Sequence, residues 1–327
     1  MSTNQIRWQR GRVVGVEHAA DSIAEIVLAI DIAHRIEPGA HIDVRLPSGD
    51  TRSYSVVAGS ADGRRLTLGV HRSSTSRGGS EYMHSLRPGD EIDITEPLQN
   101  FPLRVGASRY VLLAGGVGIT AICAMGAVLR RLSADYRFVY VGRSRSAMAF
   151  LSELEALHGD HLDVHIDDEG SGLDVVTLVD GVDHHTELYM CGPIRLMDAV
   201  RRQWHDRNLP MPNLRYETFG NSGWFEAEEF TVAVPELDVT TTVGADESML
   251  DALRRAGVDM MFDCLKGECG LCQVSVASVD GRVDHRDVFF SEQQKNSASR
   301  MCACVSRVAR DSASPRSTTG AVTLDLP

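Results

Sequence analysis

The sequence has little positive charge for its size, and this shortage excludes two kinds of partner. It holds 33 lysine and arginine residues against 45 aspartates and glutamates, which gives a net charge of −12. The phosphates of nucleic acids and the headgroups of anionic membranes repel a protein of this charge. We therefore expect a protein that binds neither nucleic acid nor a membrane surface.

An export signal is also lacking. Residues 1–10 are polar and basic and contain no apolar run of the kind that marks a signal peptide. Residues 110–129 are twenty uncharged residues, the length of a membrane helix. Because this stretch contains four glycines and begins like a buried strand, we expect a strand, a glycine loop and a buried helix instead. The sequence predicts a cytoplasmic protein, which we expect to be a monomer.

Internal repeats and low-complexity tracts are absent as well. Hydrophobic residues make up 43% of the chain and charged residues 24%, as in a typical globular protein. Since 327 residues are more than one ordinary hydrophobic core organises, the length predicts two or three domains.

A cysteine cluster near the end of the chain is the strongest positive signal, Cys264-Leu-Lys-Gly-Glu-Cys269-Gly-Leu-Cys272. Its C-x4-C-x2-C spacing is typical of the loop that holds a 2Fe–2S cluster in plant-type ferredoxins. Gly267 and Gly270 would let the backbone turn tightly and bring N–H groups near the cluster. A disulfide framework is disfavoured because nothing marks the chain as secreted. A zinc site is disfavoured because structural zinc usually takes two C-x2-C pairs.

The fourth cysteine ligand is not decided by spacing. Between Cys272 and Cys302 lie 29 residues, the count that suits plant-type ferredoxins, and between Cys272 and Cys304 lie 31. On a strand, side chains two positions apart point to the same face. Either sulfur could therefore reach the iron.

The acidity of the chain is concentrated around these cysteines. Residues 225–327 hold 17 aspartates and glutamates against 10 lysines and arginines, so −7 of the net charge lies there. An acidic face near a redox centre can steer a basic protein partner, or it can simply confer solubility, and the sequence leaves both open.

The first hundred residues have the pattern of a small antiparallel β-barrel. Short apolar runs alternate with turns at Pro38-Gly39 and Pro88-Gly89-Asp90. The predicted strands are residues 12–17, 23–30, 41–46, 53–57, 66–70 and 91–94.

Two stretches of this barrel suggest a ligand. The first is Arg52-Ser53-Tyr54-Ser55, where strand alternation would put Arg52 and Tyr54 on one face and the serines on the other. The second is Ser76-Arg77-Gly78-Gly79-Ser80, directly before a predicted helix at residues 81–86. Backbone N–H groups at such a helix start can bind an anion, although each stretch alone could be an ordinary strand or helix cap. Together they predict a planar aromatic ligand that carries a phosphate.

The next hundred residues alternate strand and helix patterns, which predicts a parallel α/β domain. We expect strands at residues 110–114, 138–141, 162–166 and 187–190, and helices at residues 121–132 and 149–157. Two loops stand out because ligands of such sheets bind at the carboxyl edge. They are Gly115-Gly116-Val-Gly118-Ile-Thr120, which departs from the strict G-x-G-x-x-G pattern, and Cys191-Gly192-Pro193.

The remainder predicts a linker followed by a ferredoxin domain. Residues 219–229 are rich in glycine, serine and charge, and such a composition indicates few buried contacts. After them come strand patterns at residues 231–234 and 239–243, a helix at residues 248–256, the cysteine loop and a strand at residues 273–279.

These motifs together resemble the phthalate dioxygenase reductase-type family, the reductases of two-component Rieske oxygenases, which include vanillate demethylase reductases. The resemblance covers nearly the whole chain and rests on several separated motifs. Those not yet quoted are Pro97-Leu-Gln-Asn100-Phe101, Arg143-Ser-Arg145, Asp284-His285-Arg286-Asp287, Cys304-Val-Ser-Arg307 and Leu324-Asp-Leu. The resemblance implies Cys304 as the fourth ligand, because the family's ligand directly precedes Val-Ser-Arg.

The resemblance also implies an enzyme with defined cofactors. Hydride would pass from NADH to FMN, and single electrons would then pass through the 2Fe–2S cluster to a separate Rieske-type oxygenase. In the barrel, Tyr54 would pack on the flavin ring, Ser55 would hydrogen-bond near its reactive nitrogen, and Arg52 would meet its phosphate. Ser53 belongs to the same strand, and Arg77, Gly78, Gly79 and Ser80 would hold the phosphate.

The nucleotide loops have implied roles as well. Gly115, Gly116 and Gly118 would cradle the pyrophosphate. Thr120 and Cys191 would border the nicotinamide beside Gly192 and Pro193, unless Cys191 is a plain buried thiol. Arg143 and Arg145 would contact the adenosine half, where two arginines could also clamp the 2′-phosphate of NADPH.

The expected domains are an FMN-binding antiparallel barrel (1–106), an NAD-binding α/β domain with a parallel sheet (107–218), a linker (219–229) and an α+β plant-type ferredoxin domain (230–327). Two alternatives remain. One is a stand-alone flavin-dependent redox module that gives its electrons to oxygen. The other is a reductase of another oxygenase class, in which the ferredoxin usually comes first and FAD is the flavin.

Overall fold

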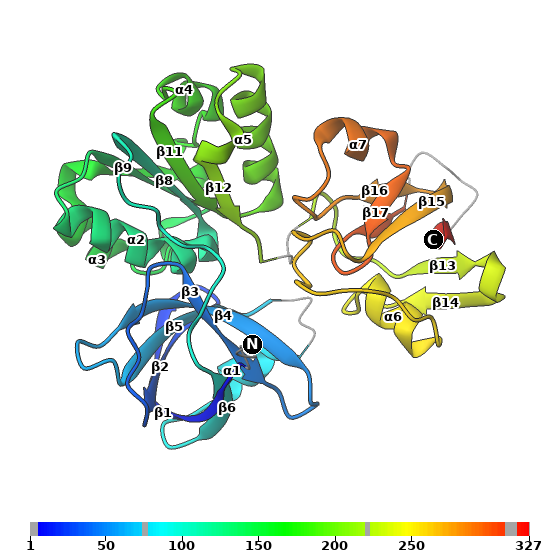
Figure 1. Cartoon of the computed structure of the whole chain (residues 1–327), viewed down its shortest axis with the longest axis horizontal. Coiled ribbons are helices and arrows are strands. Elements are labelled where there is room, and N and C mark those ends of the chain that lie inside the picture. Colours follow the sequence, from blue (N-terminus) through cyan, green and yellow to red (C-terminus); the bar gives the residue numbers. More distant parts are fainter. Residues whose placement is uncertain (1–5, 74–77, 220–222, 311–318, 327) are drawn as a thin grey trace, which may run out of the picture. The chain divides into compact units, whose positions relative to one another are not determined.

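The fold was determined as a computed structural model, shown in Figure 1, which describes residues 6–73, 78–219, 223–310 and 319–326. The chain divides into two compact units. The first comprises Met1–Gly192 and Ala199–Glu217, and the second comprises Pro193–Asp198 and Thr218–Pro327. Within the described part of the chain, no helix is both long and apolar enough to cross a membrane.

The first unit begins with the predicted barrel. Its strands are β1 (Trp8–Ala20), β2 (Ile23–Ile30), β3 (Ala40–Arg45), β4 (Thr51–Gly59), β5 (Arg65–His71) and β6 (Glu91–Thr95). They pair in the order β4-β5-β2-β1-β6-β3, and an additional antiparallel pairing of β3 with β4 closes the ring. Inward-facing residues such as Ile26, Leu28 and Leu66 fill the interior and are fully buried. All six expected strands are confirmed.

Two short elements complete the barrel. Strand β7 (Leu98–Gln99) pairs with β3, so the segment around Pro97 does lie at the closing edge, as the resemblance implies. Helix α1 (Gly79–Ser85) follows β5 and buries Met83 against the barrel core.

The second half of the first unit is a five-stranded sheet in which every strand is parallel. The strands are β8 (Arg109–Gly115), β9 (Tyr136–Gly142), β10 (Leu162–Ile166), β11 (Thr186–Cys191) and β12 (Leu214–Glu217), in the order β10-β9-β8-β11-β12. The helices are α2 (Ile119–Arg131), α3 (Leu151–His158), α4 (Val175–Asp180) and α5 (Ile194–Asp206). The uncharged stretch 110–129 is therefore a buried strand, a loop and a helix, as predicted.

The second unit has the order of elements expected of a ferredoxin. Its main sheet contains β13 (Phe230–Val234), β14 (Val239–Val243), β15 (Gln273–Asp280), β17 (Arg300–Cys302) and β19 (Gly320–Asp325), in the order β14-β13-β19-β15-β17. A small second sheet pairs β16 (Arg282–Asp284) with β18 (Arg307–Ala309). Helices α6 (Met249–Arg255) and α7 (Glu292–Ser297) complete the unit. The cysteine loop lies between α6 and β15.

Candidate redox site

The cysteine loop of the second unit is folded as tightly as its sequence predicts. Gly267 and Gly270 both have left-handed backbone conformations, with φ of 75° and 73°. A Cβ atom at Gly270 would lie 2.3 Å from the ring of Phe289, and one at Gly267 would lie 2.9 Å from the Cα atom of Asp287. Both positions therefore require glycine for two reasons, the sign of φ and the lack of space.

Backbone N–H groups of this loop point at one of the cysteine sulfurs. The amides of Lys266, Glu268 and Cys269 each donate to Sγ of Cys264 at 3.4 Å. Hydrogen bonds of this kind stabilise a thiolate and tune the reduction potential of a cluster that it ligates. These three hydrogen bonds to Cys264 fit a loop that holds a 2Fe–2S cluster.

The two candidates for the fourth ligand differ in their contacts. Cys304 is in hydrogen-bonding contact with both Cys264 and Cys272, whereas Cys302 makes that contact with Cys272 alone. Strand β17 ends at Cys302, and residues 303–305 form a turn. Both sulfurs do reach Cys272, but strand alternation is not the reason, because the two cysteines do not share a strand.

Contacts between the thiols shift their pKa values in opposite directions. The contact with Cys304 lowers the pKa of Cys264, and contacts with Cys302 and Cys304 lower that of Cys272. The same contacts raise the pKa values of Cys302 and Cys304. Among the described residues no three His, Cys, Asp or Glu side chains are grouped as around a single metal ion. A 2Fe–2S cluster does not need such a group, since four cysteines serve its two irons.

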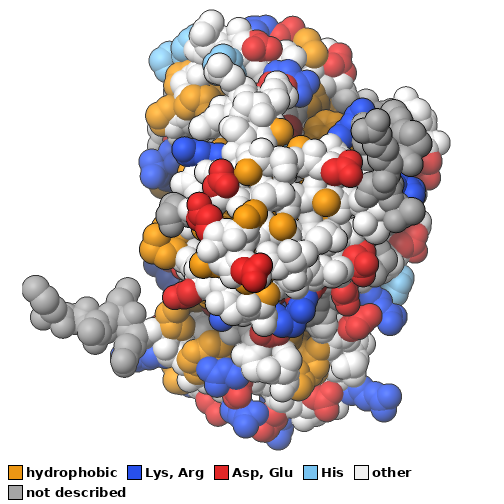
Figure 2. Space-filling model, turned by 90° about the vertical axis from the view of Figure 1, so that its right-hand side faces the viewer, with side chains coloured by type: hydrophobic (Ala, Val, Ile, Leu, Met, Phe, Trp, Pro, Cys, Tyr) orange, Lys and Arg blue, Asp and Glu red, His pale blue; other side chains and the backbone are white. Residues whose placement is uncertain are grey.

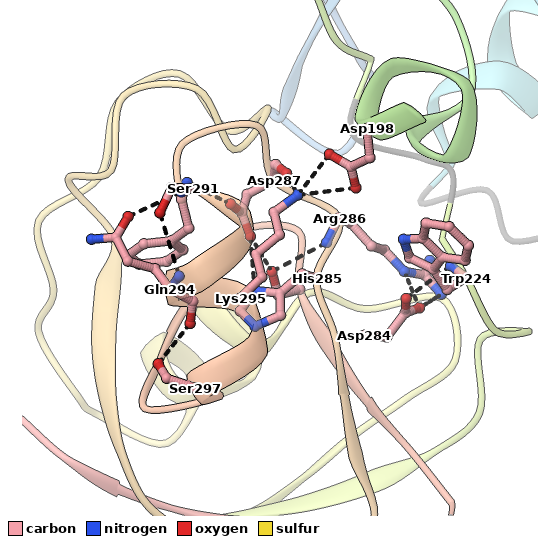
Figure 3. A network of polar contacts seen from close by, with 12 residues as sticks. Asp198, Trp224, Asp284, His285, Arg286, Asp287, Ser291, Gln294, Lys295 and Ser297 are labelled. Atoms are coloured by element: carbon pink, nitrogen blue, oxygen red, sulfur yellow. Dashed lines mark hydrogen bonds and ion pairs between the residues drawn. The ribbon is translucent and has the colours of Figure 1, made fainter. Parts of the chain in front are cut away.

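A buried carboxylate supports the cluster loop from the segment 284–287. The side chain of Asp287 is fully buried and accepts hydrogen bonds from the amide of Phe290 at 2.9 Å and from the hydroxyl of Ser306 at 3.2 Å (Figure 3). Its other partner is the His285 ring, 3.2 Å away. Burial alone would raise the pKa of Asp287, but the bond from His285 and the charge of Lys295 lower it below the usual value.

Residues just before β13 are tied to the same segment, and this corrects one expectation. The amide of Trp224 donates to Asp284 at 2.8 Å (Figure 3). Arg286 donates to the carbonyl of Phe225 at 3.0 Å. A Cβ atom at Gly223 would lie 2.4 Å from the Arg286 guanidinium. The expectation of few buried contacts in the linker is therefore wrong for residues 223–225. Gly220 and Ser222 lie outside the described residues.

In the first unit, the two barrel stretches that suggested a ligand do meet. Arg52 and Tyr54 lie on one face of β4, opposite Val44 and Ile42 of β3. A Cβ atom at Gly79, in the first turn of α1, would lie 2.8 Å from Cγ of Arg52 and 3.0 Å from the hydroxyl of Tyr54. A larger residue would force the Arg52 and Tyr54 side chains to shift, and the predicted shared face of these two residues is confirmed.

The other residues of the expected phosphate loop have different surroundings. Gly78 caps α1 with a left-handed φ of 82°, and Ser80 accepts a hydrogen bond from the amide of Ser73 at 3.1 Å. Arg77 lies outside the described residues. Burial raises the pKa of Tyr54 above its usual value, so its hydroxyl stays protonated.

The two serines of the strand occupy the opposite face. Ser53 is exposed and donates to Asp43 at 2.6 Å. Ser55 is buried, and its hydroxyl lies 3.5 Å from the carboxylate of Glu217, at the end of β12. Glu217 is only 3% exposed and pairs with Cys191 in the sheet register. The sequence patterns do not reveal Glu217, because its partner lies more than a hundred residues away.

The two nucleotide loops are in direct contact at the carboxyl edge of the sheet. A Cβ atom at Gly118 would lie 2.1 Å from the carbonyl oxygen of Cys191 and 2.8 Å from the amide of Gly192. Gly116 has a φ of 53° and open space where a side chain would stand. Gly115 ends β8 and forms part of the same edge, and Pro193 directly precedes α5.

Thr120 and Cys191 are both buried at this edge. The Thr120 hydroxyl donates to the carbonyl of Val117 at 2.9 Å, so it stabilises the glycine loop, while its methyl group packs beside Gly69 of β5. Cys191 is the last residue of β11 and is 1% exposed.

The two arginines at the end of β9 have different partners. Arg145 binds Glu169 through two hydrogen bonds of 3.0 and 3.2 Å, with Glu155 at 3.6 Å. Arg143 is exposed, and its carbonyl accepts a hydrogen bond from the amide of Asp168. A phosphate at Arg145 would have to compete with two carboxylates.

Comparison with known proteins places these features in a wider group. Residues 233–309 match the family of 2Fe-2S iron-sulfur cluster binding domains. The chain is 33% identical over 320 residues to the phenoxybenzoate dioxygenase subunit beta of Ectopseudomonas oleovorans, with 96% of each chain covered. It is 33% identical over 278 residues to the vanillate O-demethylase oxidoreductase of Pseudomonas sp. strain HR199, with 83% of this chain and 87% of the relative covered.

A solved structure has the same arrangement of parts. The structure of phthalate dioxygenase reductase, described as modular for electron transfer from pyridine nucleotides to [2Fe–2S], matches with a TM-score of 0.70 and 28% identity. The match covers 98% of each chain, so it spans the barrel, the parallel sheet and the cysteine-containing unit.

Proposed function

Because this chain belongs to the family of oxygenase reductases that includes phthalate dioxygenase reductase, we propose that it takes electrons from NADH and delivers them, by way of FMN and a 2Fe–2S cluster, to a separate Rieske-type oxygenase. The chain is an oxidoreductase of an oxygenase system and has a C-terminal 2Fe–2S domain. When bound, FMN accepts a hydride and releases electrons singly, and the cluster carries one electron at a time.

The observation that carries the proposal is the set of sulfurs in the second unit. Cys264 lies under three backbone N–H groups, and Cys304 contacts both Cys264 and Cys272. We assign Cys264, Cys269, Cys272 and Cys304 as the four ligands, with Cys302 as a packing residue of the hydrophobic core. The loop glycines would keep the backbone close enough to donate hydrogen bonds to the ligands.

The barrel residues would hold the flavin. Arg52 and the backbone of Gly78, Gly79 and Ser80 would bind its phosphate, with Arg77 in the same loop. Tyr54 would pack on the ring. Ser55 would hydrogen-bond near the reactive nitrogen of the ring once its single hydroxyl hydrogen turns away from the buried carboxylate of Glu217, to which it donates at 3.5 Å. These roles are supported by the places of the described residues on β4, α1 and β12 and by the family resemblance.

The carboxyl edge of the parallel sheet would hold the nicotinamide nucleotide. The contact between Gly118 and Cys191 brings the two loops together, and backbone N–H groups at this edge would bind the pyrophosphate. Thr120 and Cys191 would border the nicotinamide and position it without reacting. Gly115, Gly116, Gly192 and Pro193 would shape the loops, and Arg143 and Arg145 would lie near the adenosine half.

We propose four segments for these tasks: a flavin domain (1–106), a nucleotide domain (107–218), a linker (219–229) and a ferredoxin domain (230–327). The cluster would serve as the outlet for electrons. The −7 charge of residues 225–327 would attract a basic face of the oxygenase. Acidic side chains are spread across the face drawn in Figure 2, with basic ones among them, so the attraction would come from the summed charge.

The proposal is tested by mixing the purified protein with NADH and candidate Rieske oxygenases from the same cell. We expect NADH oxidation to become coupled to product formation with one of them. A protein that reduced oxygen equally well with or without every oxygenase would instead be a stand-alone flavin module. Heat-released flavin should run as FMN in chromatography, and FAD would indicate a reductase of another class.

A further inference from the structure

Glu268 forms two hydrogen bonds, one through its backbone and one through its side chain. Its backbone N–H donates to Sγ of Cys264 at 3.4 Å. Its carboxylate accepts a hydrogen bond from the backbone N–H of Thr218 at 2.9 Å. Glu268 also directly precedes the expected ligand Cys269. One residue thus connects the cluster loop to a point fifty positions earlier in the chain.

The position of Thr218 makes this connection informative. Thr218 is the first residue of the long segment of the second unit, and Glu217, the last residue of the first unit, directly precedes it. Thr218 is 3% exposed, so its N–H is shielded from water. A buried N–H that loses its partner is costly, which favours a lasting bond to Glu268.

The bond changes where the chain that leaves Glu217 is first fixed to the rest of the second unit. Without it, the next such point along the chain would be Trp224, whose amide donates to Asp284. With Thr218 fixed to the cluster loop, only the peptide bond between Glu217 and Thr218 separates the first unit from a residue that is fixed to the loop. The chain is therefore fixed to the cluster loop before the linker begins.

The cluster loop is also held on its other side, so it is a firm attachment point. The amide of Val288 donates to the carbonyl of Gly267 at 3.0 Å. Gly267 packs directly on Asp287, whose carboxylate is hydrogen-bonded on all sides by Phe290, Ser306 and His285. Movement of the loop would break these contacts together.

We propose that Glu268 is a positioning residue, which fixes the cluster loop to the chain segment leaving the flavin and nucleotide domains and thereby sets the rate of electron transfer from flavin to cluster. The effect on electron transfer rests on the proposed function, whereas the bond between Glu268 and Thr218 does not. The rate of electron transfer falls steeply with distance. Fixing the chain one peptide bond after the first unit should therefore give a faster and more uniform rate than fixing it farther along the chain.

The carboxylate could instead act only through its negative charge near the cluster, and two substitutions separate these roles. Glu268→Gln removes the charge but keeps an oxygen at the same reach to accept from Thr218. Glu268→Asp keeps the charge but is one methylene shorter and cannot span the distance. Glu236→Gln, on an exposed turn of the same unit, is the control for loss of one charge.

The first readout is amide hydrogen exchange at Thr218, which needs no NADH. We expect exchange in Glu268→Asp to be about tenfold faster or more, as for loss of a charge-assisted hydrogen bond, and exchange in Glu268→Gln to stay near that of the unaltered protein. The second readout is the rate of cluster reduction after rapid mixing with NADH. It should fall in Glu268→Asp and hold in Glu268→Gln, while flavin reduction is unchanged in both.

The reduction potential of the cluster reports the charge at position 268 and not the bond to Thr218. It should rise in Glu268→Gln, which loses the negative charge, and change little in Glu268→Asp, which keeps it. The proposal is overturned if Glu268→Asp keeps the original exchange and transfer rates, or if Glu268→Gln slows transfer as much as Glu268→Asp.

Failure of the proposed function would look different. NADH would then leave the flavin or the cluster oxidised in the unaltered protein, while the exchange result at Thr218 would still stand.

Discussion

Gly118 packs so closely on Cys191 that a Cβ atom at position 118 would lie 2.1 Å from the Cys191 carbonyl oxygen. The two loops expected to hold the nicotinamide nucleotide are therefore fixed against each other before any nucleotide binds. Since the neighbour is backbone, no side-chain movement can make room for a larger residue at position 118.

Gly118→Ala should separate the two loops and weaken NADH binding. We expect a loss of about 1–3 kcal/mol in stability, as for other overpacked sites, and a raised KM for NADH in the ferricyanide assay. Gly257→Asn is the matched control, because Gly257 lies in the second unit, outside the nucleotide loops, has open space, and asparagine tolerates its left-handed φ of 86°. Equal KM values for Gly118→Ala and the unaltered protein would contradict the predicted contact.

Cys304→Ser should lose most of the iron and the visible spectrum of the cluster, because a serine hydroxyl is a poorer ligand than a thiolate. Cys302→Ser should keep both, since Cys302 ends β17 and, among the loop cysteines, its thiol is in hydrogen-bonding contact with Cys272 but not with Cys264. The measurement is the iron content and absorption spectrum of each variant, purified without air. If Cys302→Ser bleached the protein and Cys304→Ser stayed brown, the assignment would be reversed.

Glu169→Gln should improve the use of NADPH. Arg145 is paired with Glu169 and Glu155, and these carboxylates repel a 2′-phosphate and occupy the guanidinium. We expect kcat/KM to rise several-fold for NADPH and to change little for NADH. The control is Asp163→Asn, which removes the partner of Arg137 at the start of β9 and β10. An unchanged preference in Glu169→Gln would show that this pair does not select the nucleotide.

High salt should slow the oxygenase-coupled rate more than NADH-to-ferricyanide turnover. The reason is that −7 of the charge lies in residues 225–327, and the Debye length falls to about 3 Å at molar salt. Both rates are measured over the same range of ionic strength. Equal sensitivity in the two assays would count against docking guided by charge.

Much of the fold could be predicted because its signals are local. Alternation of apolar residues located all six barrel strands, and the glycines within residues 110–129 correctly indicated a strand, a loop and a buried helix. The patterns did not predict α4, α5 or β12. Of these, β12 is only four residues long and gives no clear apolar pattern. Helix α5 does carry one, since Ile194, Met197, Val200 and Trp204 are buried at helical spacing, and it was overlooked.

The candidate site was predictable only where one motif contains the chemistry. The cysteine spacing and the strand Arg52-Ser53-Tyr54-Ser55 are such motifs. The contacts of Glu217 with Ser55 and of Glu268 with Thr218 join residues far apart in sequence, and no periodicity reports them. At Cys302 and Cys304 both sulfurs reach Cys272, but not through the assumed shared strand, because a turn begins between them. The part-buried hydrogen bonds of Trp224 and Phe225 show that composition alone does not identify a free linker.

The most direct test of the account is an anaerobic titration of the purified chain with NADH, followed by electron paramagnetic resonance and absorption. The account predicts that NADH reduces the flavin and that the signal of a reduced 2Fe–2S cluster then appears, in proportion to the amount of chain. Cys304→Ser should show flavin reduction without that signal. A fully reduced flavin beside a cluster that stays oxidised in the unaltered protein would contradict the proposed path from NADH to the cluster.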